Sequence, residues 1–591
     1  MSIIATIKDK IANAIDNLYQ QKIAIHEIQI NETKQEFNGD YTLVTFPLTK
    51  ILRKKPDEIA SELGAYLIKN DSLFVAYEVI KGFLNVTISP NYYFDFLKNN
   101  YLNQNLGFAA PNQKKVMIEY SSPNTNKPLH FGHLRNIFLG HSVAAIMKQA
   151  GYEIIKANLI NDRGIHICKS MIAWQLFANG ETPKEANMKG DHFVGRYYVM
   201  YNDEFKKQVK QLIEEGRSEE DAAKNAPIFI QAQQLLRQWE AGDQETILLW
   251  KRMNEWVYEG FYATYEKMGI TFDKFYYESN TYLLGRDFVM KALANGVLFE
   301  KEDKSIWIDL QDEGLDQKLL LRGDGTSVYI TQDIGTAVLK YNDYKMDTSV
   351  YVIGDEQNYH MQVLKLILQK MKEPCADGIY HLSYGMVELP SGRMKSREGT
   401  VVDADDMIDE MKAIAQKNTE ELGKVQNFSE PQLAELYTQL GLGALKFYLL
   451  RVDPKKKMMF NPQESIDFHG FTGPFIQYGH TRICSILKKA TIQNFEINQA
   501  IEMSLAEKNI LKLVEQYPTV VEQAATEMNP SLIGNYVYQL VKQFNSFLVD
   551  HSILKAEQED IMKFRLQLCM ICKHIISNSL FLLGIDAPEQ M

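Results

Sequence analysis

Cysteine is scarce in this sequence, and long apolar runs are missing. The 591 residues include five cysteines, at Cys168, Cys375, Cys484, Cys569 and Cys572. So few cysteines, in odd number, exclude a scaffold held by disulfides and are typical of a reducing compartment. No stretch of about 18 apolar residues occurs, which excludes a helical membrane span. The first residues are interrupted by Lys8, Asp9 and Lys10, so we expect no signal peptide. These features predict a cytoplasmic protein without a membrane partner.

The sequence also lacks an excess of basic residues. Lys and Arg number 64 against 75 Asp and Glu, which gives a formal net charge of −11. This balance disfavours a protein that coats nucleic acid, but it leaves room for specific RNA binding through local basic patches. Hydrophobic residues make up 45% and charged residues 24% of the chain, as in ordinary globular proteins. At about 150 residues per domain, the length predicts three or four domains.

Three regions differ in their patterns. Residues 1–106 predict an α+β module, with a helix from Ile3 to Leu18 and another that opens at Pro56. Strand patterns in this module cover 23–30, 41–46 and 75–88. Residues 471–591 show helical periodicity almost throughout and predict an all-α domain.

The middle region, 107–470, predicts a Rossmann-like, doubly wound parallel sheet, which makes the whole chain an α/β protein. A strand at 116–118, a helix at 134–150 and a strand at 154–160 form the strand–helix–strand unit of that fold. A polar stretch at about 180–260 predicts a helical insertion. The α/β pattern then resumes, with strands at 327–330 and 350–353 on either side of a helix at 333–341.

Two short motifs in the middle region contain candidate catalytic residues. His130-Phe131-Gly132-His133 lies between a strand and a helix, where two imidazoles at a helix N-terminus suit a polyphosphate. Gly132 has no Cβ, so a flat base can approach the backbone there. Taken alone, the tetrapeptide is equally consistent with two ordinary histidines.

The second motif is a glycine-bracketed basic loop, Ser391 to Thr400, which contains Arg393, Lys395 and Arg397. Its cations are suited to the charge that develops on a triphosphate. Alone, such a loop is more often a solvated surface segment.

In this order, the two motifs resemble the signatures of class I aminoacyl-tRNA synthetases, written H-I-G-H and K-M-S-K-S. The residues around them resemble the arginyl-tRNA synthetases in particular, over the whole chain. The matching segments are Ile118 to Asn124, Lys127 to Asn136, Tyr329 to Ile334, Gly354 to Gln357 with His360, and Leu583 to Met591. The resemblance implies an arginine–tRNA ligase, in which 1–106 contacts tRNA, 107–470 is catalytic and 471–591 binds the anticodon.

The resemblance also assigns site residues. Arginine is expected to bind to Glu119, Ser122, Asn124, His133, Tyr329, Asp333 and Gln357. ATP is expected to bind to His130, Gly132, His133, Met394, Lys395, Ser396 and Arg397. The implied catalytic residues are His130, His133, Lys127 and Lys395. Carboxylates at two of the arginine positions are physically reasonable, because a planar guanidinium is best read by a bidentate carboxylate.

The implied reaction is the activation of L-arginine by ATP to arginyl-adenylate, followed by transfer to the 3′ end of tRNA(Arg) with release of AMP and pyrophosphate. Mg²⁺ is expected to accompany ATP, and no metal is expected to be bound tightly by the protein. For this family, tRNA is also needed in the activation step. We expect a monomer, because no unexplained apolar helix stripe suggests a self-interface.

The basic loop departs from the family pattern, since Ser396 stands where the second lysine is usual. Some arginyl enzymes place a lysine just before the histidine motif, and Lys127 is in that position. We hypothesise that Lys127 supplies the missing phosphate contact. A solvated loop lysine is the alternative.

Three rival functions remain open from the sequence. A sister enzyme such as the cysteine synthetase would need zinc ligands near the cleft, and no suitable set is visible. A related protein that binds RNA without catalysis would not need the histidines, Asp333 and Gln357. A simpler nucleotidyltransferase would need neither terminal domain. Basic clusters at 50–55, 455–457 and 482–489, and the aromatic residues Tyr478, Tyr536, Tyr538 and Phe544, are weak candidates for RNA contacts.

Overall fold

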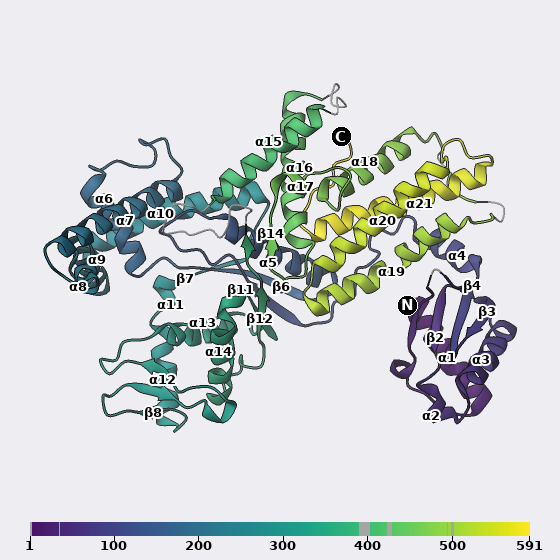
Figure 1. The fold of residues 1–591 in the computed structure, drawn as a ribbon, viewed down its shortest axis with the longest axis horizontal. Coiled ribbons are helices and arrows are strands. Elements are labelled where there is room, and N and C mark those ends of the chain that lie inside the picture. Colours follow the sequence, from purple (N-terminus) through teal and green to yellow (C-terminus); the bar gives the residue numbers. More distant parts are fainter. Residues whose placement is uncertain (1–2, 35, 389–401, 422–427, 493, 498–500) are drawn as a thin grey trace.

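The computed structural model describes residues 3–34, 36–388, 402–421, 428–492, 494–497 and 501–591. Figure 1 shows a central parallel sheet with helices on both faces and a group of long helices beside it. A small module at the N-terminal end lies against those long helices, well away from the sheet. None of the helices in the described part of the chain combines the length and apolarity that a membrane crossing needs.

The N-terminal module is a four-stranded antiparallel sheet covered by helices, with strand order β1-β2-β4-β3. Helix α3 begins at Pro56, which suits the first turn because proline lacks the N–H that would remain unpaired there. The expected strand at 23–30 is wrong: residues 25–27 form a 3₁₀ turn, and pairing starts only at Ile30. The elements are α1 (Ile3–Tyr19), β1 (Ile30–Glu32), β2 (Tyr41–Val44), α2 (Leu48–Leu52), α3 (Pro56–Asn70), β3 (Phe74–Ile80), β4 (Phe83–Ile88) and α4 (Pro90–Asn100).

The central sheet has five parallel strands in the order β12-β11-β5-β6-β7. The chain runs from β5 to β6 and β7 on one side and returns to β11 and β12 on the other. The order therefore reverses between β5 and β11, and a crevice outside the carboxyl ends of these strands is where such folds bind ligands. The strands are β5 (Lys115–Glu119), β6 (Glu153–Ile160), β7 (Lys274–Tyr277), β11 (Thr348–Gly354) and β12 (Ile379–Tyr384).

Helices α5 (Phe131–Gln149), α13 (Tyr329–Tyr344) and α14 (Asn358–Lys370) connect and cover these strands. The strand expected at 327–330 is wrong, because α13 already begins at Tyr329. The β-branched and aromatic residues that favoured a strand there are the first turn of a helix, which packs on the neighbouring α12 (Leu284–Ala294). A separate small core joins α12–α14 to a three-stranded sheet, β8 (Phe299–Glu300), β9 (Ile306–Ile308) and β10 (Lys318–Leu321).

The stretch predicted as a helical insertion at about 180–260 lies within a group of helices that projects from the sheet (Figure 1). Its apolar faces pack around Phe193, Tyr197 and Phe261, which are all buried. Its helices are α6 (Ile165–Phe177), α7 (Gly190–Glu214), α8 (Glu219–Asn225), α9 (Pro227–Glu240) and α10 (Gln244–Met268), with the short α11 (Glu278–Thr281) after β7.

In the described part of the remaining chain, the two-residue strands β13 (Val387–Glu388) and β14 (Met458–Met459) pair with each other, and the other elements are helices. Asp40 of the N-terminal module is paired with Lys508 at 2.7 Å and with Lys512 at 2.5 Å, both from α19. The helices are α15 (Ala404–Glu421), α16 (Glu430–Leu450), α17 (Pro462–Ser465), α18 (Gly473–Lys489), α19 (Leu505–Glu527), α20 (Ser531–Asp550) and α21 (Glu559–Leu582).

Candidate active site

Polar residues gather at the carboxyl edge of the central sheet. Glu119 ends β5, Glu278 follows β7 and Gln357 lies just after β11. Because parallel strands end at one edge, segments that are far apart in sequence meet here. The loop after β6 is joined to the loop after β5: Asn161 Nδ2 donates to the Ser122 carbonyl at 3.1 Å, and Asn124 forms a β-bridge with Asn161.

The two histidines of the H-x-G-H motif lie together at the start of α5. Their ring centroids are 3.8 Å apart, and the His130 backbone N–H donates to His133 Nδ1 at 3.0 Å. Nδ1 of His133 is therefore an acceptor, so a neutral His133 carries its proton on Nε2. A Cβ on Gly132 would lie 3.0 Å from the His130 ring, so a side chain here would require the ring to shift.

Both histidines are neutral at physiological pH. Burial lowers the pKa of His130 to about 3, and the nearby Lys127 adds to this shift. Burial also lowers the pKa of His133 well below its ordinary value, with His130 and Lys127 contributing repulsion. Neutral imidazoles act here as hydrogen-bond donors, each through one N–H, and not as fixed positive charges.

Lys127 lies beside these histidines in a cavity of about 240 Å³. Residues Lys127 to His130, side chains of α7 and Asp403 line it. Burial lowers the pKa of Lys127. Helix α7 packs against the loop, since a Cβ on Gly195 would come within 2.8 Å of Pro128. Lys127 is thus a half-buried residue that lines the same cavity as His130.

The basic loop expected to contact ATP lies outside the described residues, and with it Met394, Lys395, Ser396 and Arg397. Its C-terminal flank is described and pairs with the histidine motif. The Phe131 N–H donates to the Val402 carbonyl at 2.9 Å, and the Ala404 N–H donates to the Leu129 carbonyl at 3.0 Å. The segment that follows the basic loop is therefore joined by backbone hydrogen bonds to the histidine motif, about 270 residues earlier.

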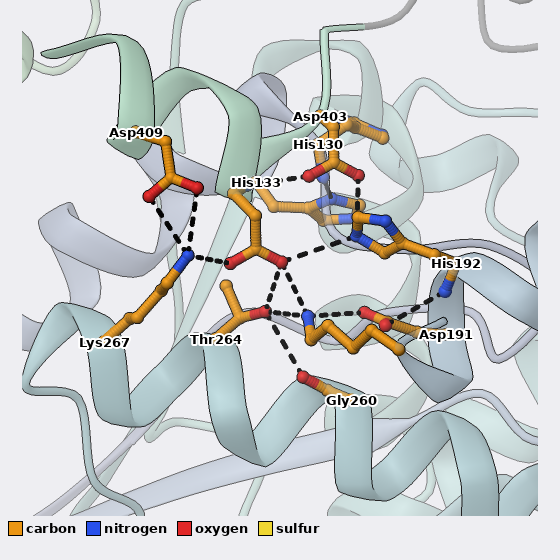
Figure 2. Close-up of polar contacts among 11 residues, drawn as sticks. His130, His133, Asp191, His192, Gly260, Thr264, Lys267, Asp403 and Asp409 are labelled. Carbon is orange, nitrogen blue, oxygen red and sulfur yellow. Dashed lines mark hydrogen bonds and ion pairs between the residues drawn. The ribbon is translucent and has the colours of Figure 1, made fainter. Parts of the chain in front are cut away.

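A polar cluster fixes this flank to the insertion (Figure 2). Asp405, in the first turn of α15, is 2.7 Å from Lys189 Nζ and 3.4 Å from Lys267 Nζ. His192 Nε2 lies 3.3 Å from Asp403 and 3.4 Å from Asp405. The hydrogen bond with Asp405 raises the pKa of His192, although burial opposes this. Burial raises the pKa of Asp405, but its cationic neighbours lower it by more, so the pKa is lowered overall.

His192, Asp403 and Asp405 present ligand-type atoms within 4.8 Å of one another. Such a group can hold a divalent cation. Here Lys189 and Lys267 already occupy the Asp405 carboxylate, so its negative charge is balanced from within the chain. This cluster is not visible in the sequence, because His192 is on α7 whereas Asp403 and Asp405 lie more than 200 positions later, at the start of α15.

Asp333 and Tyr329 lie on one face of α13, as the spacing of four residues predicts. Asp333 Oδ2 is 2.6 Å from His360 Nε2, and the His360 ring lies 5.2 Å from that of Tyr329. Burial raises the pKa of the nearby Glu278 to about 7; Arg163 opposes the shift, and repulsion from Asp162 and Asp333 adds to it. Sequence reasoning assigned no role to His360 or Glu278, although His360 stood in a matching segment.

Glu119 is buried and already has a cationic partner inside the chain. Its Oε2 is ion-paired with Lys340 Nζ, and the lysine side chain is 1% exposed. The sequence analysis missed Lys340. Its position seven residues after Asp333 puts it on the same face of α13, so helical spacing was a usable signal. Gln357, by contrast, is exposed at the first turn of α14.

Cys569 and Cys572 are buried in the helical core, as are the other three cysteines, and all five are free. The two cysteines are three positions apart, a spacing found in metal sites, but here both are core positions on α21. Two of the candidate aromatic residues, Tyr536 and Phe544, are buried as well. Tyr478 instead lines an apolar pocket of about 430 Å³ with Phe475, Arg482 and the terminal Met591.

Comparisons with known proteins agree with this arrangement. The family model of the class I tRNA synthetase (R) catalytic domain matches residues 97–461. The model of the DALR anticodon binding domain matches 476–591, and that of the arginyl tRNA synthetase N terminal domain matches 5–88.

Curated relatives match the chain from end to end. The arginine–tRNA ligase of Flavobacterium psychrophilum is 49% identical, with 100% of both chains covered. That of Bacteroides thetaiotaomicron is 48% identical, covering 99% of this chain and 100% of its own. Among solved structures, Thermus thermophilus arginyl-tRNA synthetase has a TM-score of 0.80 at 24% identity, with both chains covered completely.

The methionyl-tRNA synthetase of Mycobacterium tuberculosis, solved with methionyl-adenylate, has a TM-score of 0.50 at 12% identity and covers 81% of this chain and 92% of its own. The shared fold and the histidine pair define the class, which is that of the class I aminoacyl-tRNA synthetases. Within that class, the chain belongs to the arginyl-tRNA synthetase family and is a ligase that forms an aminoacyl-tRNA bond.

Proposed function

We propose that this arginine–tRNA ligase activates L-arginine at the crevice between β5 and β11 and passes it to the 3′ end of tRNA(Arg). The arginine carboxylate attacks the α-phosphate of ATP, supplied with Mg²⁺, and pyrophosphate leaves. The ribose hydroxyl of tRNA then attacks the adenylate carbonyl and releases AMP. Neither step needs a nucleophile from the protein, so positioning and charge stabilisation account for catalysis.

The observation that carries the proposal is that two carboxylates lie at the carboxyl edge of the sheet. Glu119 ends β5, the strand before the histidine motif, and Asp333 is on α13. Asp333 is held by His360, and Glu119 is held by Lys340. We assign both carboxylates to the guanidinium of arginine, with the Tyr329 hydroxyl beside them. Ser122, Asn124, His133 and Gln357 are assigned to the amino and carboxylate ends.

The phosphate side is assigned to the histidine pair and Lys127. His133 offers its Nε2–H, because its Nδ1 already accepts from the backbone. His130 offers one imidazole N–H, and Gly132 leaves its backbone open to a base. Lys127 adds positive charge from the same cavity. On the loop outside the described residues, Met394, Lys395, Ser396 and Arg397 are assigned to ATP, with Lys395 as its catalytic cation.

Binding of tRNA is assigned to the two terminal domains, proposed as 1–106 and 471–591, on either side of the catalytic 107–470. The pocket formed by Phe475, Tyr478, Arg482 and Met591 has aromatic walls and one cation. Unpaired bases are bound by stacking and by contacts with Arg. We assign an unpaired base of tRNA to this pocket.

The test is ATP–pyrophosphate exchange with each amino acid, with and without tRNA. We expect exchange with arginine alone, and only when tRNA is present. Exchange with cysteine, or tight RNA binding with no exchange at all, would contradict the proposal. We also propose a monomer in the cytoplasm; sedimentation of the purified enzyme tests the first, and the five free cysteines support the second.

A further inference from the structure

Lys340 is a buried cation that takes no part in the two chemical steps of the reaction. It lies on α13, and its Nζ is ion-paired with Glu119. The same Nζ lies 4.5 Å from the Tyr351 ring centroid and 6.0 Å from that of Tyr276. Tyr351 belongs to β11 and Tyr276 to β7, so the lysine is enclosed by the strands that end at the site.

We propose that Lys340 determines specificity for arginine by holding Glu119 ionised, so that Asp333, Glu119 and Lys340 together carry a charge of −1, which one guanidinium neutralises. This inference deepens the proposed function and rests on it. Asp333 and Glu119 contribute two negative charges, and Lys340 contributes one positive charge. Lys340 is thus a positioning residue that acts through Glu119 and does not itself touch the reacting atoms.

The burial of Glu119 is the first argument. A carboxylate that is 5% exposed and has no cation beside it takes up a proton, because burial disfavours the charged form. Burial also lowers the pKa of Lys340, but the charge of Glu119 outweighs this and the pKa is raised overall. Each charge therefore keeps the other ionised in a place where neither would persist alone.

The second argument is that a buried ion pair is in general weak evidence for a role in stability. A buried pair can often be replaced by apolar residues of similar size with little loss of stability, or with a gain. This pair joins the C-terminal end of β5 to the face of α13 that also carries Asp333. A charged ligand that binds beside the pair would explain why it is there. The ligand would supply the second cation that two carboxylates require.

The consequence concerns citrulline, which has the shape of arginine but a neutral ureido group. An ionised Glu119 accepts hydrogen bonds and rejects the ureido oxygen, which is also an acceptor. Once protonated, Glu119 donates and can bind that oxygen. Loss of Lys340 should therefore weaken arginine binding and strengthen citrulline binding, a change that a purely structural role would not produce.

The effect should depend on pH through Glu119. The titratable groups that face it are Lys340, Asp333 and Tyr329 on α13, Tyr351 on β11 and Tyr276 on β7, with Glu278 beside Asp333. In a Lys340→Met variant, the carboxyl loses its only paired cation among these groups. It then ionises only as the pH rises, so arginine binding should recover toward alkaline pH.

The experiment measures KM and kcat for arginine in tRNA-dependent exchange from pH 6.5 to 9, with citrulline as inhibitor. For Lys340→Met we expect KM for arginine to rise roughly 10- to 100-fold at pH 7, with kcat changed far less. The ratio of variant to wild-type KM should fall as pH rises. Citrulline should inhibit the variant more strongly than the wild type.

Two further variants complete the test. Lys345→Met, at an exposed lysine just beyond the same helix, is the matched control and should behave as wild type. Lys340→Met combined with Glu119→Gln should raise KM without any recovery at high pH. A wild-type KM in Lys340→Met, or a raised KM that pH and citrulline do not alter, overturns the inference.

If Lys340→Met does not fold, Lys340→Gln, which keeps a polar group beside Glu119, takes its place. KM for arginine should again rise at pH 7 and recover as pH rises, and an unchanged KM overturns the inference. Failure of the proposed function would look different, because the wild-type enzyme would then show no exchange with arginine in the presence of tRNA.

Discussion

The Asp333 carboxylate and the His360 imidazole meet directly, with Oδ2 and Nε2 2.6 Å apart. The two side chains come from α13 and α14, on either side of β11. The contact fixes one oxygen of Asp333 and leaves the carboxylate a defined direction in which to receive a ligand. A guanidinium needs this kind of fixed, planar acceptor.

Replacing His360 by Ala should therefore loosen Asp333. We expect KM for arginine to rise about tenfold while KM for ATP stays near the wild-type value, because a hydrogen bond to a charged group is lost only on the arginine side. Steady-state exchange kinetics measure both constants. His26→Ala, at an exposed site in the N-terminal module, is the control. Equal changes in both constants would argue against this role.

Lys127→Ala tests the hypothesis that this lysine replaces the missing cation of the basic loop. Removing one donor that stabilises a transition state typically lowers the rate by a factor of about 100 or more. We expect a loss of that size in arginine activation, measured by exchange with saturating tRNA. Lys114→Ala, at an exposed lysine before β5, should have no effect. Activity within a few-fold of wild type would rule the hypothesis out.

His192 should make stability depend on pH. Its hydrogen bond with Asp405 raises its folded pKa, so its contribution is fully present below the unfolded value of about 6.5. The contribution is lost as pH rises through the folded pKa. In thermal unfolding from pH 6 to 9, the advantage of wild type over His192→Gln should shrink with rising pH. A constant difference would contradict the assignment.

Glu278 should produce a similar trend at lower pH. Its folded pKa of about 7 lies above the ordinary value of 4.5, so the folded state binds more protons in this range. Stability should therefore fall as pH rises from about 4.5 to 7. Denaturant unfolding at pH 5 and pH 8 should show that Glu278→Gln loses less stability than wild type across this interval. An equal loss in both proteins would count against it.

The pocket of the helical domain can be tested with Tyr478→Ala and Arg482→Ala. Both should raise KM for tRNA, by an amount that reflects about 1–3 kcal/mol for a lost stacking contact at Tyr478. Arg482→Ala should also reduce the slope of log K for tRNA binding against log salt concentration by about one. Filter binding at several salt concentrations measures this. Lys224→Ala, on the exposed α8, serves as control.

Much of the fold was predictable because its signals are local. Pro56 with two acids marks the start of α3, and the apolar runs of β5 and β6 flank a helix of clear periodicity. The strand predicted at 327–330 was wrong. The β-branched and aromatic residues there begin α13, and packing on α12 stabilises this helix. Tertiary contacts can override local propensity in such short segments.

The candidate site was predictable where a motif carried it, as for His130 and His133. Lys340 and His192 were not predicted, because each acquires its meaning from a partner in another element. Lys340 meets Glu119 more than 200 positions earlier, and His192 meets Asp405 more than 200 positions later. Helical spacing places Lys340 on the same face of α13 as Asp333, but it does not reveal a partner that lies so far away in the sequence.

The pairing of Asp40 with Lys508 and Lys512 has a consequence for how the molecule is made. Asp40 receives its cations from residues that lie 468 or more positions later. During synthesis, Asp40 of the N-terminal module therefore has neither of these two cations until α19 has been made. Docking of the N-terminal module on α19 is then a late event of folding. A chain that terminates before α19 would leave the Asp40 carboxylate exposed to the folding machinery of the cell.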